Sequence, residues 1–187
     1  MQVSQIIAAA ALFAGSAVAT PKPAASTPKP IEAPNGNFTD EMLKGHHFYR
    51  SQHSAKDLKW STKLAGLAQK KINSCKFEHD DEPYGENLAY NSEKTWASFI
   101  NQWGGERTQY DFNRPTGYSD DTGHFTQLVW KDTTSLGCGY TKCSYGVLVS
   151  CFYDPQGNIE GDNNKYFKDN VGKQVSGKAT DKYVSSS

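Results

Sequence analysis

Two histidines and two glutamates are the side chains of this sequence best suited to bind a metal ion or transfer a proton. Of the five histidines, His79 lies shortly before Glu86, and His124 follows Glu106 along the chain. Imidazole is a common ligand of zinc, and carboxylates bind zinc or magnesium. Because the four residues spread over 45 positions (124 − 79), their spacing alone leaves open both a shared site and unrelated surface histidines.

Other catalytic patterns are absent from the sequence or are not specific. It contains no G-x-S-x-G, H-E-x-x-H, G-x-G-x-x-G or P-loop motif. A glycosidase pair of Glu86 and Glu106 is conceivable, but a chain with 20 acidic residues offers many such pairs. Lys and Arg together also number 20, and this zero net charge argues against binding to nucleic acid through its phosphates.

The N-terminus and the cysteines predict a secreted protein. A short apolar run from Ile6 to Ala14 precedes Ala17-Val18-Ala19, so residues 1–19 are expected to be a signal peptide. Outside the N-terminus no apolar run reaches the roughly 18 residues that a membrane span needs. An even number of cysteines in an oxidising compartment predicts two disulfides with three pairings open, and it leaves no free thiol for catalysis: Cys75, Cys138, Cys143 and Cys151.

Composition divides the rest of the chain into three parts. Residues 20–36 are rich in Pro, Ser and Thr and are expected to form an extended linker. The folded unit is expected over residues 37–172, and the polar, Ser-rich residues 173–187 are expected to form a flexible tail. Asn37-Phe38-Thr39 is an N-glycosylation acceptor at the edge of the folded unit, with Asn37 as the modified residue.

Hydrophobic periodicity predicts helices first and strands later. One helix is expected from a Thr39 cap to about Ser54, and a second after a Ser61 cap. A third carries apolar residues at helical spacing, namely Trp96, Phe99, Ile100 and Trp103. Short strands are expected over 125–130, 136–140 and 147–153, which together with the helices indicate an α+β fold.

A loop rich in aromatic residues follows the third helix. Tyr110, Phe112 and Tyr118 lie in a stretch that Pro115 and Gly117 keep from forming a helix or strand. Aromatic side chains on a loop either anchor it to the core or line a binding site, and both interpretations stay open.

Four ordered motifs resemble the CAP superfamily, which comprises the cysteine-rich secretory proteins, antigen 5 and the class one pathogenesis-related proteins. Residues 123–133 (GHFTQLVWKDT) resemble its first signature, and residues 148–159 resemble its second, although Phe152 stands where a polar residue is usual. Residues 84–89 (YGENLA) and 46–50 (HHFYR) resemble two further segments of the family. The resemblance covers essentially the whole folded unit and is greatest to secreted fungal members of the Pry type.

This resemblance implies a three-layer α-β-α sandwich with a small antiparallel sheet. It also implies disulfides between Cys75 and Cys143 and between Cys138 and Cys151. The four residues introduced above are expected to converge in a cleft that binds zinc or magnesium in some members: His79, Glu86, Glu106 and His124. Gly104 and Gly105 are unusual before the second glutamate, and we expect them to end the third helix early and to leave Glu106 less fixed.

Fungal members of the family bind and export sterols through the aromatic loop, which implicates Tyr110, Phe112 and Tyr118, and relatives also bind fatty acids. We therefore expect a secreted, non-enzymatic carrier of a sterol or other small lipid, extracellular or associated with the cell wall. Two alternatives remain open, namely an effector that acts through a protein partner and a metal-dependent hydrolase.

Overall fold

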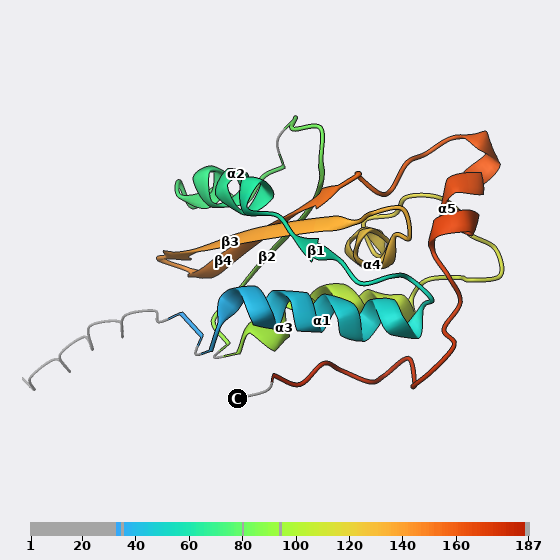
Figure 1. Ribbon diagram of the computed structural model, residues 1–187, viewed down its shortest axis with the longest axis horizontal. Helices are drawn as coiled ribbons and strands as arrows, with labels where there is room; N and C mark the ends of the chain where they lie inside the picture. Colours follow the sequence, from blue (N-terminus) through green and yellow to red (C-terminus); the bar gives the residue numbers. More distant parts are fainter. Residues whose placement is uncertain (1–32, 35, 80, 94, 186–187) are drawn as a thin grey trace, which may run out of the picture.

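A four-stranded mixed sheet lies between α2 on one face and α1 and α3 on the other (Figure 1). This computed structural model describes residues 33, 34, 36–79, 81–93 and 95–185, so the expected signal peptide and nearly all of the linker lie outside the described residues. The helices are α1 (Phe38–Gln52), α2 (Thr62–Ile72), α3 (Trp96–Gly105), α4 (Gly123–Val129) and α5 (Lys165–Asn170), with short 3-10 turns η1 (Glu106–Thr108) and η2 (Asp162–Asn164). The strands are β1 (Lys59–Trp60), β2 (Gly85–Asn91), β3 (Ser135–Cys143) and β4 (Gly146–Asp154).

The strand order is β1-β3-β4-β2. The β2, β3 and β4 strands pair antiparallel, whereas the two-residue β1 pairs parallel to β3. The α+β class, the three layers and the antiparallel sheet are thus confirmed, and β1 and β2 are strands that the sequence did not predict. No helix in the described part of the chain is long and apolar enough to cross a membrane.

Local sequence explains where the helices begin. The Asn37 side chain accepts the Asp40 N–H and caps α1, so the cap lies two residues before the predicted Thr39. Ser61 caps α2 as predicted, since its hydroxyl accepts the Leu64 N–H. The apolar stripe predicted for the third helix is fully buried in α3.

The predicted strand over 125–130 is wrong, because residues Gly123–Val129 form α4. Six of the seven residues of this helix are buried, including Phe125, Leu128 and Val129. Because Thr126 and Gln127 are buried together with the apolar residues, polar and apolar positions do not separate into two faces, and periodicity cannot distinguish such a short buried segment from a strand.

Two disulfides hold the sheet and α2 together. Cys138 and Cys151 are directly opposite each other on β3 and β4 and are bonded, with Cα atoms 4.0 Å apart. Cys75, just after α2, is bonded to Cys143 at the end of β3. Both pairings implied by the family resemblance are confirmed.

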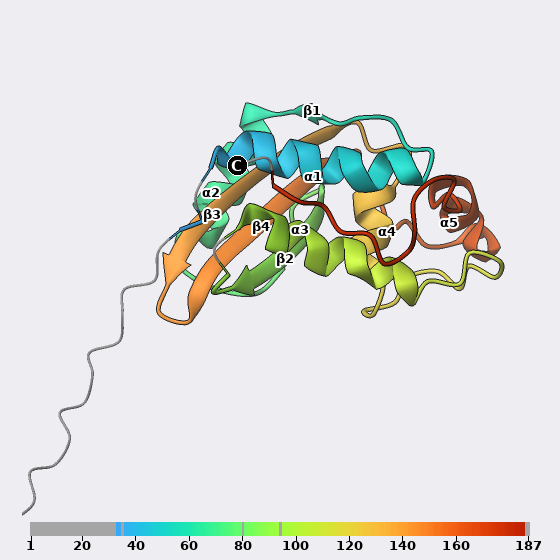
Figure 2. The ribbon, with the colours of Figure 1, turned by 90° about the horizontal axis from the view of Figure 1, so that it is seen from below.

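The segment after Gly172 differs from the expected flexible tail. It runs along α1 and α3 (Figure 2). The Arg107 guanidinium donates hydrogen bonds to the carbonyl oxygens of Lys178, Ala179 and Asp181, and Tyr183 is buried. The sequence of this segment is polar and resembles a loose tail, but its backbone carbonyls satisfy a buried cation, which composition does not reveal.

Candidate functional site

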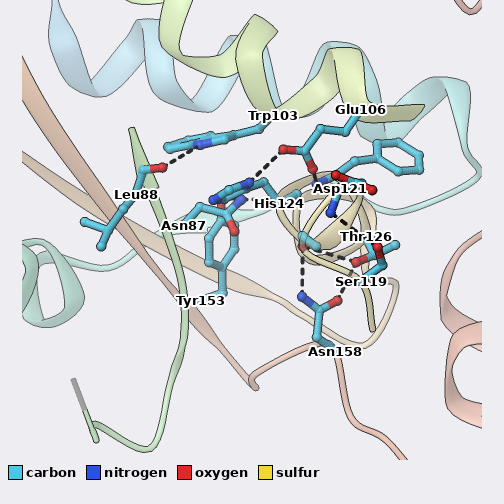
Figure 3. A network of polar contacts seen from close by, with 12 residues as sticks. Asn87, Leu88, Trp103, Glu106, Ser119, Asp121, His124, Thr126, Tyr153 and Asn158 are labelled. Carbon is cyan, nitrogen blue, oxygen red and sulfur yellow. Dashed lines mark hydrogen bonds and ion pairs between the residues drawn. The ribbon is translucent and has the colours of Figure 1, made fainter. Parts of the chain in front are cut away.

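Glu106 and His124 form one half of the predicted tetrad. Glu106 follows α3 directly, and one of its carboxylate oxygens accepts a hydrogen bond from His124 Nδ1 at 2.7 Å (Figure 3). Its other oxygen accepts the backbone N–H of Phe125 at 3.0 Å, in the first turn of α4. Because Nδ1 is the donor to Glu106, Nε2 is the nitrogen of His124 left for a ligand.

The expectation that the two glycines leave Glu106 less fixed is therefore wrong, since both carboxylate oxygens are bonded. α3 also continues through both glycines to Gly105. Gly104 has a packing role instead, because a Cβ there would lie 2.1 Å from Cζ of Tyr49 on α1.

A network of buried polar groups supports the His124 backbone from behind. Asn87 on β2 donates to the His124 carbonyl oxygen and to the Tyr153 hydroxyl (Figure 3). The Tyr153 hydroxyl lies 2.7 Å from His46 Nε2, and His46 Nδ1 lies 2.7 Å from the Met42 carbonyl oxygen. Since the Met42 carbonyl only accepts, Nδ1 carries the proton of the neutral His46 ring and Tyr153 donates to Nε2.

Burial keeps this network neutral. It lowers the pKa of His46 to about 3 and raises the pKa of Tyr153 above its ordinary value. His46 was not among the residues predicted for the site. Its place in the HHFYR segment was the available signal.

The Trp103 ring holds the His124 side chain from the α3 side. The two rings are stacked with centroids 6.4 Å apart, and Trp103 Nε1 donates to the Leu88 carbonyl oxygen on β2. A hollow of about 180 Å³ borders this pair and is lined by Glu106, His124, Trp103, Phe77, Tyr90 and neighbouring residues.

His79 and Glu86 form the other half of the tetrad. His79 Nδ1 lies 2.9 Å from Glu86 Oε2, and the same oxygen lies 2.7 Å from Lys71 Nζ. Ser150 on β4 donates to the second oxygen of Glu86. Lys71 and Ser150 could not be predicted from the sequence, because only the sheet and α2 bring them to Glu86.

The tetrad is thus two His–Glu pairs rather than a closed metal centre. In the part of the chain that the structure describes, no three potential ligands gather around one point. His79 borders a hollow of about 90 Å³ with Lys71 and Glu78, whereas His124 borders the hollow beside Trp103. Protein zinc sites normally use three or four protein ligands, so this donor set does not fit a structural or catalytic zinc centre.

The aromatic loop divides between core and surface. Tyr110 is buried, and Phe112 is half-buried with its ring stacked on His53 at 5.5 Å. Phe112 also lines a hollow of about 360 Å³ with Pro115 and Val171. Tyr118, in contrast, is 48% exposed and lies over Gly123, where a Cβ would come within 2.6 Å of its ring. Tyr110 and Phe112 therefore lie together, and Tyr118 lies beside the His124 pair.

Comparisons with known proteins agree with this fold. Residues 43–153 match the family model described as "CAP: Cysteine-rich secretory protein family". The chain is 38% identical over 142 residues to Protein PRY2 of Saccharomyces cerevisiae and 32% identical over 201 residues to Secreted protein RBT4 of Candida albicans. These alignments cover 72% and 93% of this chain but only 41% and 56% of the two fungal proteins.

A solved structure is similar as well. Venom allergen-like protein 4 of Schistosoma mansoni matches with a TM-score of 0.55 and 25% identity, over 70% of this chain and 99% of that one. With its three layers, its two disulfides and the segments shared with fungal relatives, the chain belongs to the CAP family of cysteine-rich secretory proteins.

Proposed function

We propose that this protein is a secreted, non-enzymatic CAP protein that binds a sterol or similar small lipid and carries it outside the cell. The proposal rests on the position of Phe112 on the aromatic loop. Phe112 lines a hollow of about 360 Å³ together with Pro115 and Val171. The same hollow is also lined by Asn113, Lys131, Lys168 and Lys173, so apolar and cationic groups face a ligand together.

Secretion is supported by the two disulfides and by the name of a relative, Secreted protein RBT4. Disulfides persist in oxidising compartments and are rare in the cytosol. The signal-peptide pattern of residues 1–19 supports the same proposal.

Burial of apolar surface is sufficient for useful affinity. About 300 Å² of apolar ligand surface, at about 25 cal/mol per Å², gives about 7.5 kcal/mol before association costs of several kcal/mol. Micromolar affinity therefore requires a loop that is already ordered. The packing of Tyr110 and Phe112 against the Phe125 ring supplies that order.

A titration of residues 20–187 with a fluorescent sterol tests the proposal. Saturable binding that an unlabelled sterol competes away is the expected result. Binding to no sterol or fatty acid would refute the lipid carrier. Capture of a specific protein would then favour the alternative of an effector that acts through a protein partner.

We propose that His79 and His124 form only a weak site for a divalent cation, zinc or magnesium. Each ring is hydrogen-bonded through Nδ1 to a carboxylate, as metal-ligating histidines commonly are, so His79 and His124 have Nε2 available. Calorimetry with Zn²⁺ and with Mg²⁺ on the wild type and on His124→Ala tests this site. Equal heats for the two proteins would refute it.

The hydrolase alternative has little support in the site. Glu86, the carboxylate nearest to His79, is already bonded to Lys71 and Ser150. A general base must instead reach a substrate proton or a water. A Glu86→Gln variant should accordingly bind sterol like the wild type.

A further inference from the structure

Three lysines line the hollow of about 360 Å³ beside the aromatic loop, and none of the described residues that line it is acidic. Lys131, Lys168 and Lys173 contribute the cationic groups, and the other polar side chain is that of Asn113. The whole chain carries 20 acidic and 20 basic residues, so three cations around one hollow are a local excess of positive charge. A recess lined by one sign of charge attracts ions of the opposite sign.

The fold gathers these lysines from separate parts of the chain. Lys131 lies just after α4, Lys168 lies on α5, and Lys173 begins the C-terminal segment. Figures 1 and 2 both show α4 beside α5. The backbone N–H of Lys131 donates to the Asn170 carbonyl oxygen, and the N–H of Asp132 donates to the Asn170 side chain. These bonds fix the backbone from which the lysine side chains extend toward the hollow.

Neutral oxygens, and not carboxylates, hold two of the three lysines. Lys173 Nζ donates to the side-chain oxygen of Asn113 at 2.7 Å, and Lys168 Nζ donates to the Asn163 carbonyl oxygen at 3.3 Å. In the part of the chain that the structure describes, none of the three lysines forms an ion pair with a carboxylate. Their side chains are therefore positioned without their charge being neutralised.

Apolar side chains line the rest of the hollow, namely those of Phe112, Pro115 and Val171. The Phe112 ring is half-buried and is held in place, since it stacks on His53 at 5.5 Å and lies 6.0 Å from the Phe125 ring. A volume of about 360 Å³ lies in the range of small-molecule sites. A matching ligand therefore combines an anionic group for the lysines with a compact apolar group for this wall.

We propose that this hollow binds a small organic phosphate monoester. A phosphate monoester carries a charge of about −1.5 to −2 at pH 7 and offers three strong acceptor oxygens. Lysine ammonium groups are compact point charges that bind phosphate, so three of them suit a doubly charged group better than a singly charged one. The organic part of the ligand contacts Phe112 and Pro115. This site goes beyond the proposed lipid carrier and does not rest on it, because charge supplies its selectivity.

A calorimetric titration of the purified protein with phenyl phosphate tests this site. Phenyl sulfate has the same ring with a single charge, and inorganic phosphate has the charge without the ring. Phenyl phosphate should bind saturably and about fivefold more tightly than either, because it alone offers both groups. Its affinity should fall several-fold as the salt concentration rises. The backbone amide resonances of residues 112–114 and 171–173 should shift during the titration, since these residues surround the hollow.

Three lysine variants separate the site from a general effect of charge. Lys131→Gln and Lys173→Gln each remove one charge from the hollow and should each weaken phenyl phosphate about fivefold. Lys165→Gln is the matched control, because Lys165 lies on α5 but is paired with Asp169 and does not line the hollow. It changes the net charge of the protein by the same amount and should bind phenyl phosphate like the wild type. None of the three side chains is buried, so the ligand-free variants should melt at the wild-type temperature.

Equal weakening of phenyl phosphate in all three variants would overturn the site, because the effect would then follow net charge alone. Wild-type affinity in both Lys131→Gln and Lys173→Gln would overturn it as well. Equal affinity of the wild type for phenyl phosphate and phenyl sulfate would overturn the phosphate monoester as its ligand. Absence of saturable phenyl phosphate binding, in a protein that binds sterol, would overturn this site and leave the lipid carrier standing. The reverse result would support this site and refute the carrier.

Discussion

His46 should make the stability of the fold fall at acid pH, because its ring is buried in the folded state. Burial lowers its pKa from 6.5 to about 3 in the folded state, whereas the unfolded chain keeps the ordinary value. Between these values the unfolded state binds the extra proton, so folding stability is fully present above pH 6.5 and is lost as the pH falls. Each pH unit is worth about 1.4 kcal/mol, so lowering the pH from 6.5 to 5 should remove about 2 kcal/mol through this one residue.

Urea unfolding at pH 7.5 and at pH 5 measures this loss. His46→Gln cannot gain the proton, so its stability should fall by about 2 kcal/mol less than that of the wild type over the same range. If His46→Gln and the wild type lose the same stability, the neutral His46–Tyr153 hydrogen bond is not what we infer.

Three further predictions follow from packing and capping. Gly104→Ala should destabilise the fold by about 1–3 kcal/mol because its Cβ would meet the Tyr49 ring. Gly105→Ala has open space around its Cβ and should be neutral or stabilising, so thermal melting should give Gly104→Ala the lower melting temperature. Arg107→Ala should detach the C-terminal segment, so the backbone amides of residues 173–185 should exchange hydrogen faster than in the wild type. Arg114→Ala, at an exposed arginine, is the control and should leave their exchange rates unchanged. Asn37→Asp should keep the α1 cap, whereas Asn37→Ala should cost about 1 kcal/mol in chemical denaturation; equal stability of the two would refute the cap.

The sequence predicted helices with an apolar stripe and strands with a continuous run of β-forming residues. α2 and α3 carry apolar stripes at helical spacing, and β4 is buried along nearly its whole length, so these elements and β3 were found in the right place. α4 was mistaken for a strand because it is short and its polar residues Thr126 and Gln127 are buried with its apolar ones. The tail was mistaken for a loose end because its contacts are made by backbone carbonyls, which every sequence carries.

The candidate site was predictable as a set of residues but not as an arrangement. Family motifs identified both histidines and both glutamates, and the structure brings them together in pairs. Lys71 and Ser150 were not predicted, because Lys71 reaches Glu86 only when α2 packs on the sheet and Ser150 only when β4 pairs with β2. His53 was also missed, since a lone histidine at the end of a helix carries no pattern.

α4 connects the His124 pair to the aromatic loop, and Glu106→Gln tests that connection. The Glu106 carboxylate bonds both His124 and the Phe125 N–H, and the Phe125 ring packs against Tyr110 and Phe112. A glutamine offers only one accepting oxygen, so while His124 keeps its proton on Nδ1 one of the two donors loses its partner, at a cost of about 1–3 kcal/mol. We expect the first turn of α4 to loosen and sterol affinity to fall, because the aromatic loop loses a fixed support. Glu86→Gln is the control, since Glu86 is bonded to Lys71 on α2, Ser150 on β4 and His79. Equal sterol affinity in the two variants, measured by fluorescence titration, would show that the pair and the loop are independent.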